Sequence, residues 1–563
     1  MRILMLAHAF NSLTQRLWLE LEAEGHDLTL EYDVNDAVTR EAVRLAKPDV
    51  ILAPFLKRAI PEDVWRATPC LIVHPGPLGD KGPSALDWAV QTGREAWGVT
   101  VIEAVAEMDA GPVWGMSDFA MRQAPKGSLY RREVTSGAVQ AVRQALHRRL
   151  NYLEPLKTRN SGAEDTKPAM RQADRAIDWA SMTSADILAR IRAGDGQPGV
   201  RDDIDGHAVW LHDACPAHGA HGAPGTIIGQ KNKAVLRATV DGAIWIGHMT
   251  VTIDGTRRLK LPATRALDVL ELSEPPVVEA DDAPNGVSVA REGDVAVIRF
   301  PFLNGAMSVA RSKALEAAIR GATGSDAKAI VLTGGAEFWS NGIDLATIEA
   351  APSPAEESLR AIEAIDDVCL AMLQATDKWV VAGLQGNAGA GGVFMALAAD
   401  QVIARDGVVL SPHYKNMGNL YGSEYWTYLL PKRLGEAGAA ALMETRMPIL
   451  AREAVKLGLI DAVRAGHPAA FEAGLIATVQ SQCACDGFAK AVAAKAKIRA
   501  LDEMEAPLES YRATELEQMR LNFFGFDTSY HVARLNFITA VPKSRTPLHL
   551  ARHRQRERVP VSA

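Results

Sequence analysis

The stretch LQGNAGAGGVFMALAADQVIA, residues 384–404, places a cluster of glycines between an apolar run and a short helical pattern. Gly391 stands at the predicted first residue of that helix, where the helix dipole favours negative charge. Glycines at this point also let another segment of backbone approach closely. The simplest interpretation of the cluster is a tight packing turn between a strand and a helix.

Apolar runs that alternate with helical patterns flank this stretch and recur in the first 120 residues. Such alternation predicts parallel sheets with helices on their faces. From about residue 288 the predicted strands are Val295–Phe300, Ala329–Leu332, Trp379–Ala382 and Gln401–Ala404. Near the N-terminus they are Ile3–Ala7, Leu28–Glu31, Val50–Ala53 and Leu71–Val73, with predicted helices Leu13–Ala23 and Arg40–Ala46. Ligands of such sheets bind beyond the carboxyl ends of strands, and His74 follows one such end.

The residues between these two α/β regions have a different pattern. After the helical stretch SADILARIRA, residues 184–193, short strand-like runs separated by glycines predict a small β-barrel. A stretch rich in proline and acidic residues indicates a linker. We therefore expect an α/β multidomain chain with the boundaries 1–165, 166–272, 273–287 as the linker, 288–480, and 481–563 as a helical segment with a basic tail.

The basic tail contains Lys543, Arg545, Arg552, Arg554, Arg556 and Arg558. A solvated chain end is the favoured interpretation. The alternative is a clamp for the phosphates of a nucleotide-like ligand, because arginine binds phosphate groups in a bidentate manner.

Composition limits the class of protein. A chain of 563 residues is too long for one core, so two to four domains are expected. A net charge of −7 argues against a nucleic-acid-binding protein, and no apolar window is long enough to predict a membrane span. The five cysteines are Cys70, Cys215, Cys369, Cys483 and Cys485. So few predict a cytoplasmic protein without a disulfide framework. Cys483 and Cys485 could hold half of a metal site, but a helix face is favoured because no cluster of Cys and His accompanies them, and no metal is expected.

Three segments in the first half of the chain form an ordered set. LIVHPGPLGDKGPSALDWAV covers residues 71–90, TVIEAVAEMDAGPVWG covers 100–115, and RAIDWASMTSADILARIRAGDGQPG covers 175–199. Together they resemble the motifs of formyltetrahydrofolate-dependent formyltransferases. The resemblance covers about residues 1–270 and implies a Rossmann-like formyltransferase domain, a small OB-like β-barrel domain and 10-formyltetrahydrofolate as a ligand.

The resemblance places His74 and Asp109 at the family's catalytic histidine and aspartate. Histidine titrates near neutrality and can take or give a proton, and a carboxylate can hold the imidazolium. Without the flanking motifs, His74 would be a strand end and Asp109 a turn residue. The family has asparagine where this chain has Ile72. Losing that amide costs about 2–4 kcal/mol of oxyanion stabilisation, which favours a thiol over an amine as formyl acceptor.

Three other residues are candidate ligand contacts. Ile60 lies in residues 55–61, which resemble the family's pterin-contacting loop. Ser12 followed by Gln15 predicts a capping box, and Gln15 is also a candidate ligand contact because its helix follows the first strand. Arg131, in SLYRREV, is either a solvated helix charge or a phosphate contact.

The second half of the chain carries another set of motifs. EFWSNGIDL at residues 337–345, with residues 384–404 and 431–463, resembles the crotonase, or enoyl-CoA hydratase/isomerase, family. The resemblance covers about residues 288–465 and implies a β-β-α spiral fold and a coenzyme A thioester as ligand. The family's shared device is a pair of backbone amides that bind the thioester oxygen, here those of Asn341 and Gly391. Asn304, in FLNGAMS, matches an asparagine near the coenzyme A-binding edge.

The stretch HYKNMGNLYGSEYW, residues 413–426, holds the candidates for acid-base chemistry. Hydratases of this family use two glutamates, and Phe394 and Tyr414 replace them here, so water addition is not expected. Glu424 follows Ser423, a predicted N-cap, and a place in the first helical turn favours its ionised form. We predict that Tyr414 and Glu424 form an acid-base pair. The alternative is a packed aromatic residue and a helix acid.

The order of these motifs over essentially the whole chain, with residues 413–435, resembles the HypX or HoxX family of hydrogenase maturation factors. This resemblance implies that formyl passes from 10-formyltetrahydrofolate to coenzyme A. Formyl-CoA then loses carbon monoxide, which becomes a ligand of the iron in NiFe hydrogenase. Hydrogenase assembly proteins are then expected partners, beside the small-molecule substrates.

Three alternatives to this function stay open. The first is a formyl-CoA hydrolase or transferase that releases formate or passes the formyl group onward. The second is a fatty-acid hydratase, against which Phe394 and Tyr414 speak. The third is a non-catalytic scaffold for hydrogenase assembly, which Ile72 supports.

Overall fold

The computed structural model describes residues 1–157 and 165–555. The chain divides into two compact units. The first contains Met1–Ile227, Arg237–Ile246 and the end of the chain from Pro542, and the second contains Ile228–Leu236 and Gly247–Val541. Contacts therefore group the chain's end with its beginning, whereas the sequence was divided into consecutive segments.

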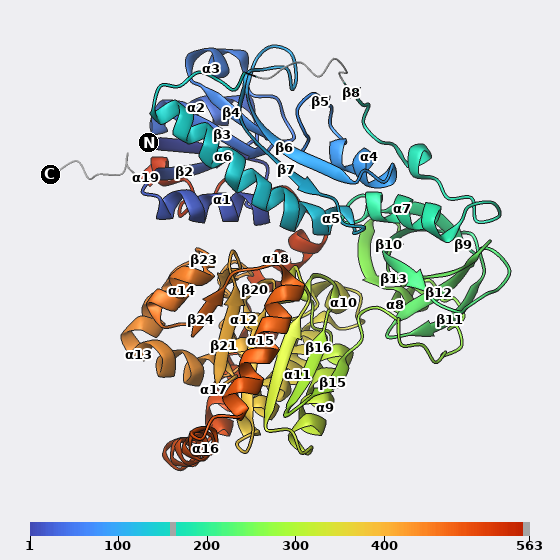
Figure 1. Cartoon of the computed structure of the whole chain (residues 1–563), viewed down its shortest axis with the longest axis vertical. Helices are drawn as coiled ribbons and strands as arrows, with labels where there is room; N and C mark the ends of the chain where they lie inside the picture. The colour runs from blue at the N-terminus through green and yellow to red at the C-terminus, as the bar shows by residue number, and fades with distance from the viewer. Residues whose placement is uncertain (158–164, 556–563) are drawn as a thin grey trace. The chain divides into compact units, whose positions relative to one another are not determined.

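A six-stranded sheet with the order β2-β1-β3-β4-β6-β7 forms the centre of the first unit (Figure 1). Its strands are β1 (Arg2–Ala7), β2 (Asp27–Tyr32), β3 (Val50–Phe55), β4 (Cys70–His74), β6 (Ala96–Glu103) and β7 (Val113–Ala120). The first four are parallel, as predicted, whereas β6 and β7 are antiparallel to their neighbours. The short connection between β6 and β7 explains their direction, because a parallel pair needs a longer crossover.

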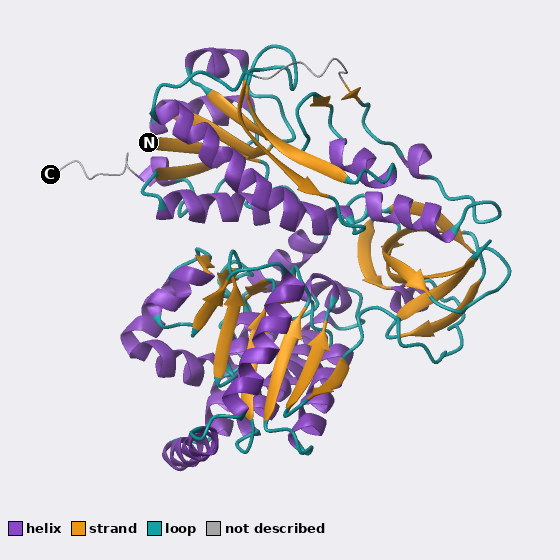
Figure 2. Ribbon diagram, viewed as in Figure 1, coloured by secondary structure: helices purple, strands orange, loops and turns teal. Residues whose placement is uncertain are grey.

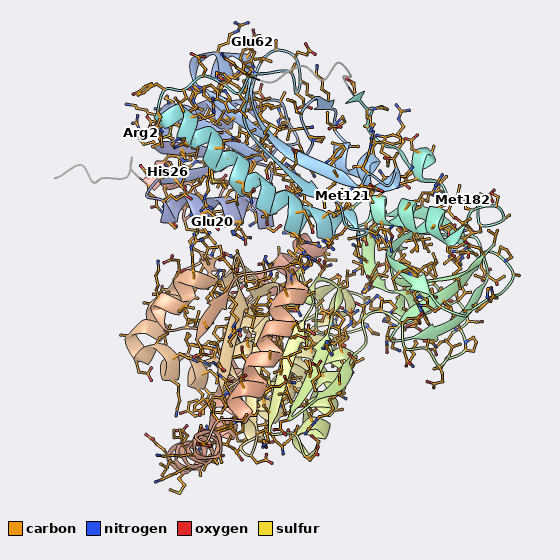
Figure 3. All side chains as sticks on the ribbon, in the orientation of Figure 1. Arg2, Glu20, His26, Glu62, Met121 and Met182 are labelled. Carbon is orange, nitrogen blue, oxygen red and sulfur yellow. The ribbon has the colours of Figure 1, made fainter. Side chains whose placement is uncertain are left out.

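Two helices of the first unit are joined by a buried charge. Glu20 of α1 (Ser12–Ala23), labelled in Figure 3, accepts hydrogen bonds from Arg16 and from Arg143 of α6 (Thr135–Leu150). α1 begins after Asn11, whose side chain accepts from the Thr14 amide. The predicted capping box from Ser12 to Gln15 is therefore wrong, because Ser12 is already the first helical residue.

A small antiparallel sheet follows in the chain. Its order is β11-β12-β13-β10-β9, and β14 pairs with β13. The strands are β9 (Val200–Ile204), β10 (His207–Ala217), β11 (Ile227–Lys231), β12 (Ala234–Thr239), β13 (Gly242–Ile253) and β14 (Arg257–Pro262). The glycine-punctuated pattern predicted strands within β10, β12 and β13, of which β10 and β13 are longer than expected, and the OB-like barrel is the fold that the six strands form. Helix α7 (Ser184–Gly194) precedes them, capped by Thr183 and Asp186.

Two sheets build the second unit (Figure 2). The larger has the order β15-β16-β17-β19-β21-β24, and the smaller has the order β18-β20-β22-β23. The larger contains β15 (Ser288–Glu292), β16 (Val295–Phe300), β17 (Ala329–Gly334), β19 (Trp379–Leu384), β21 (Gln401–Arg405) and β24 (Ala462–Arg464). The smaller contains β18 (Phe338–Ser340), β20 (Asn387–Gly389), β22 (Val409–Ser411) and β23 (Ile449–Leu450). From β17 to β22, successive strands go alternately to the larger and the smaller sheet, which is the repeat of a β-β-α spiral.

Helices cover both faces of the larger sheet, which explains its almost continuous apolar strands. On one face Val295, Val297 and Val331 pack against α15 (Pro468–Cys483). On the other face lies the main core, with residues from α9 (Val309–Thr323), α11 (Pro354–Gln374), α12 (Gly391–Leu397), α13 (Trp426–Glu444) and α17 (Leu508–Phe524). The C-terminal part is helical as expected, and also contains α16 (Phe488–Glu505) and α18 (Ser529–Ile538).

The end of the described chain lies against β2 in the first unit (Figure 1). His553 contacts Thr29 through Nδ1 at 2.6 Å and Glu31 through Nε2 at 3.2 Å. Arg554 pairs with the same Glu31 at 2.7 Å, and Thr546 donates to it. Glu31 is fully buried. The interpretation of the tail as a solvated end is therefore wrong for residues 546–555.

The other basic residues of the tail differ. Lys543 and Arg545 are exposed, whereas Arg556 and Arg558 lie outside the described residues. Among residues 1–157 and 165–555, no helix combines the length and apolar character that crossing a bilayer requires. That same part of the chain brings no three His, Cys, Asp or Glu residues together as a metal site.

We expect Glu31→Ala to lower the free energy of unfolding of the first unit by about 3–5 kcal/mol, because it removes the carboxylate that accepts from Nε2 of His553 and pairs with Arg554. Arg552→Ala is the matched control, since Arg552 and Glu22 form a half-exposed pair worth less than about 1 kcal/mol. Differential scanning calorimetry of both variants measures the two effects. Equal and small losses would show that the tail is not held through Glu31.

Candidate active sites

In the first unit, the predicted catalytic histidine lies between two carboxyl groups. His74 is the last residue of β4 and is buried. Its Nε2 is 2.9 Å from Oδ2 of Asp80, and its Nδ1 is 3.7 Å from Oδ2 of Asp109. The structure therefore brings the predicted pair together, and the two acceptors can orient the ring and hold it as imidazolium.

Asp109 has a left-handed backbone, with φ of 56°. Its Oδ2 also accepts a hydrogen bond from the Gly82 amide at 3.2 Å. Aspartate is one of the few side chains that adopt this conformation readily. The turn and the contact with His74 thus coexist in one residue, and the turn interpretation does not compete with the catalytic one.

The sequence analysis missed Asp80, which lies closer to His74 than Asp109 does. Its Oδ1 is buried and has no hydrogen-bond partner among the described residues. A methyl group on Gly76 would lie 2.4 Å from Oδ2 of Asp80 and 2.5 Å from Nε2 of His74, so only glycine leaves room for the pair. The available signal was the Pro- and Gly-rich stretch after His74, which indicates a tight loop that returns to its start.

The predicted ligand contacts of the first unit have these positions. Nε2 of Gln15 donates to the Phe10 carbonyl at 2.8 Å. Arg131 lies beside Gly127, and Ile60 is buried in an apolar cluster with Leu4 and Val64. A role in ligand binding stays a prediction for Gln15, Arg131 and Ile60.

In the second unit, the predicted base lies against the predicted oxyanion glycine. A methyl group on Gly391 would be 2.0 Å from Oε1 of Glu424. Gly391 is the first residue of α12, and the first amides of a helix have no acceptor within the helix. The carboxyl group of Glu424 and the N-terminus of α12 therefore border the same small space.

The second predicted oxyanion donor is already engaged. The amide of Asn341 donates to the Gly305 carbonyl at 2.8 Å, and its side chain donates to the Asn304 carbonyl at 2.9 Å. In this conformation the prediction for the Asn341 amide is wrong, because one N–H directed at a backbone carbonyl is not available to a ligand. Asn304, at φ of 55°, lies in the segment that Asn341 holds, and its ligand contact stays a prediction.

Tyr414 and Glu424 are in direct contact, and their role as an acid-base pair stays a prediction. The phenol donates to Oε2 of Glu424 at 2.5 Å and also lies 3.0 Å from the Ser423 carbonyl. The Phe394 ring stacks on Tyr414, with centroids 5.3 Å apart and planes inclined by 16°. The two positions at which hydratases carry glutamates thus form one aromatic stack beside the buried Glu424.

Glu424 does not lie in the first turn of a helix. α13 begins at Trp426, and Glu424 and Tyr425 both have left-handed backbones, with φ of 65° and 58°. The predicted N-cap at Ser423 is therefore wrong: its hydroxyl donates to Asp366 instead. The expected preference for the ionised form is lost with that helical position.

Burial makes Glu424 a weaker acid, whereas the expected helical position would have made it a stronger one. Burial raises the pKa of Glu424 to about 8, and the nearby charge of Asp366 adds to the rise. Burial likewise raises the pKa of Asp366 to about 7 and that of Glu515 to about 8. The pKa of Tyr414 is raised well above its ordinary value by burial and by Glu424. A carboxylate with a raised pKa is a stronger base, so this pocket supplies the basicity that a solvated glutamate lacks.

Comparison with known proteins supports the fold of each half of the chain. The enoyl-CoA hydratase/isomerase model matches residues 291–520, and the model of the formyl transferase C-terminal domain matches residues 169–261. A methionyl-tRNA formyltransferase from Fervidobacterium nodosum is 25% identical over 217 residues, 37% of this chain and 68% of the relative.

Two relatives match the whole chain. Hydrogenase maturation factor HoxX from Bradyrhizobium diazoefficiens is 49% identical over 559 residues, 99% of this chain and 98% of the relative. The crystal structure of HypX from Aquifex aeolicus in complex with tetrahydrofolic acid is 44% identical, with a TM-score of 0.94 and full coverage of both chains. The fold and the sites thus define an enzyme that joins a formyltransferase to a crotonase domain. The chain belongs to the HoxX (HypX) family of hydrogenase maturation factors.

The raised pKa of Glu424 predicts how stability depends on pH. Glu424 holds its proton more firmly in the folded than in the unfolded protein. At a pH at which the unfolded chain has already lost this proton, folding must take it up again, and the free energy of unfolding is lower. Stability is fully present below the unfolded pKa of 4.5 and falls as pH rises towards the folded pKa of about 8.

Glu424→Gln removes this titration, so we expect the variant to gain thermal stability over the wild type as pH increases from 5 to 9. Glu444→Gln is the control, because the side chain of Glu444 is mostly exposed. Thermal unfolding followed by circular dichroism at several pH values measures the difference. A gap between variant and wild type that does not change with pH would contradict the burial of an ionisable Glu424.

Proposed function

We propose that this protein moves a formyl group from 10-formyltetrahydrofolate to coenzyme A and then releases carbon monoxide from formyl-CoA, as a ligand for the iron of NiFe hydrogenase. The observation that carries the proposal is the buried Tyr414–Glu424 pair at the N-terminus of α12. The tetrahydrofolic acid bound to the related HypX supports the folate half of the proposal.

In the first step, His74 takes the proton of the coenzyme A thiol, and the thiolate attacks the formyl carbon. The tetrahedral intermediate then breaks its bond to the folate nitrogen, which leaves with the proton from the imidazolium. Tetrahydrofolate and formyl-CoA are the products. Asp80 and Asp109 flank the ring that carries the positive charge between these two proton transfers, so they stabilise it when it is needed.

In the second step, Glu424 removes the proton from the formyl carbon while the bond from that carbon to sulfur breaks. The electron pair of the C–H bond becomes the lone pair of carbon monoxide, and the thiolate leaves. Tyr414 gives its proton to sulfur and regains one from Glu424 along their hydrogen bond. The net change is formyl-CoA to carbon monoxide and coenzyme A, and the Gly391 amide holds the carbonyl oxygen.

The same pocket is badly suited to adding water to a thioester. Phe394 and Tyr414 stack where two carboxylates would hold a water molecule. The remaining acid, Glu424, is already bonded to a phenol. Excluding water also protects formyl-CoA from hydrolysis to formate.

The central experiment is incubation with coenzyme A and 10-formyltetrahydrofolate labelled with ¹³C in the formyl group. We expect labelled carbon monoxide in the headspace, trapped on reduced haemoglobin. Labelled formate in its place would replace this proposal by the hydrolase, and no turnover together with ligand binding would favour a scaffold.

Glu424→Gln is expected to leave formyl-CoA formation unchanged and to lower the output of carbon monoxide by about a hundredfold or more, because a general base is removed. Tyr414→Phe should lower it less, since Glu424 remains. Glu444→Gln and Tyr421→Phe are the matched controls, and formyl-CoA and carbon monoxide are measured in the same reaction. Wild-type carbon monoxide output from Glu424→Gln would refute the assignment of the base.

Gly76→Ala tests the first step without touching a functional group. The added methyl displaces the pair of His74 and Asp80, so we expect formyl transfer to fall by about a hundredfold. Gly137→Ala is the control, because a methyl group there makes only ordinary contacts in α6. Carbon monoxide formation from supplied formyl-CoA should stay normal in both variants. Unchanged formyl transfer in Gly76→Ala would separate His74 from the reaction.

A further inference from the structure

We propose that Asp366 and Glu515 are positioning residues for Glu424: they hold its backbone in a left-handed turn and set the pH at which its carboxyl group loses a proton. The inference rests on the proposed decarbonylation step. Neither residue belongs to the motifs that identified the site, since Asp366 lies on α11 and Glu515 on α17.

The turn that carries Glu424 is strained. Glu424 and Tyr425 are consecutive left-handed residues, and neither is glycine, asparagine or aspartate. Each such residue costs about 1–2 kcal/mol, so the turn persists only where other contacts fix it. Without the turn, the chain would enter α13 directly and the Glu424 carboxyl would leave Gly391.

Two buried carboxyl groups supply those contacts. Oδ1 of Asp366 accepts from the Glu424 amide at 2.8 Å, and both its oxygens lie 2.8 Å from the Ser423 hydroxyl. Oε2 of Glu515 accepts from the Tyr425 amide at 2.9 Å, and Oε1 accepts from the Thr427 amide at 2.8 Å. Three backbone amides on either side of the kink therefore end on two carboxyl groups that are fully buried.

Accepting the hydrogen bonds of these backbone amides does not require a carboxyl group, because the side chains of asparagine and glutamine also accept hydrogen bonds. A carboxylate in such a place costs several kcal/mol to bury. Its distinctive effect is its charge, which makes a neighbouring carboxyl group hold its proton. Asp366 and Glu515 therefore influence the protonation of Glu424 as well as its position.

The titratable and charged groups around Glu424 come from three parts of the unit. They are Asp366 and Cys369 of α11, Arg512 and Glu515 of α17, and Tyr414 and Tyr425 of its own segment. The cation of this group within the described residues, Arg512, lies 4.0 Å from Asp366 and 2.7 Å from the half-exposed Asp367. Its charge is thus shared, and the acids around Glu424 are not neutralised.

The two residues can be separated by amide substitutions. In Asp366→Asn the oxygen can still accept from the Glu424 amide, while the new NH₂ can donate to the Ser423 hydroxyl. Geometry is kept and the charge is lost. In Glu515→Gln both original oxygens face backbone N–H groups, so the new NH₂ must face a donor and the turn loses a contact.

For Asp366→Asn we expect the pH profile of carbon monoxide formation from formyl-CoA to move down by about one unit, with about a fivefold higher rate at pH 7, because Glu424 then ionises more easily. For Glu515→Gln we expect kcat to fall by about tenfold or more at every pH, with little change in KM. The matched controls are Glu356→Gln and Glu517→Gln, which remove exposed charges from the same helices. Both controls should keep the wild-type profile.

Two results would overturn the proposal: a profile of Asp366→Asn equal to that of Glu356→Gln, or an unchanged kcat in Glu515→Gln. A separate readout is the titration of Glu424 in protein with ¹³C-labelled glutamate carboxyls, assigned by its loss in Glu424→Gln. We expect its midpoint to be lower in Asp366→Asn. If the wild type makes no carbon monoxide, the proposed function fails, and this titration alone decides whether Asp366 controls Glu424.

Discussion

The hydrogen bonds from the amides of residues 424, 425 and 427 to two buried carboxyl groups determine where the Glu424 side chain lies. Glutamate and tyrosine have no intrinsic preference for a left-handed backbone, so the turn exists because the rest of the fold supplies acceptors at the right points. Those acceptors come from α11 and α17, which surround the main core of the second unit. Packing of that core therefore fixes the reactive group, and the active site cannot be separated from the stability of the helices around it.

This arrangement explains an apparent contradiction between burial and function. Three acids in one buried cluster weaken the folded state as pH rises, because each must lose its proton in an apolar environment. A protein selected for stability alone would replace them with apolar residues of similar size. Keeping these acids, despite the loss of stability, is an advantage only if a strongly basic carboxylate is needed. The proposed abstraction of a formyl proton needs such a base.

The sequence was sufficient for the fold class and for two of the contacts between motif residues. Strand patterns predicted most of the sheets, and the motifs placed His74 beside Asp109 and Tyr414 beside Glu424. It failed where distant residues decide local structure. Ser423 followed by Glu424 is a good helix start by local rules, but Asp366, more than fifty positions away, takes the Ser423 hydroxyl and the Glu424 amide. The prediction of a solvated tail was wrong for the same reason. The sequence shows only that the tail is rich in arginine, whereas the fold brings the buried Glu31 to Arg554.

Ile72 and Phe394 are positions at which the two halves depart from the motifs that they resemble. In the first half Ile72 stands where the formyltransferase motif has an amide donor, and Asp80 lies against Nε2 of His74. A thiol acceptor suits this arrangement, since a thiol must lose a proton and is already a good nucleophile. In the second half Phe394 and Tyr414 stand where hydratases carry water-holding acids, and Glu424 is the base that the proposed reaction directs at a C–H bond. Under that proposal each change makes a thioester easier to form or harder to hydrolyse, so both halves would handle the same sulfur-bound one-carbon unit.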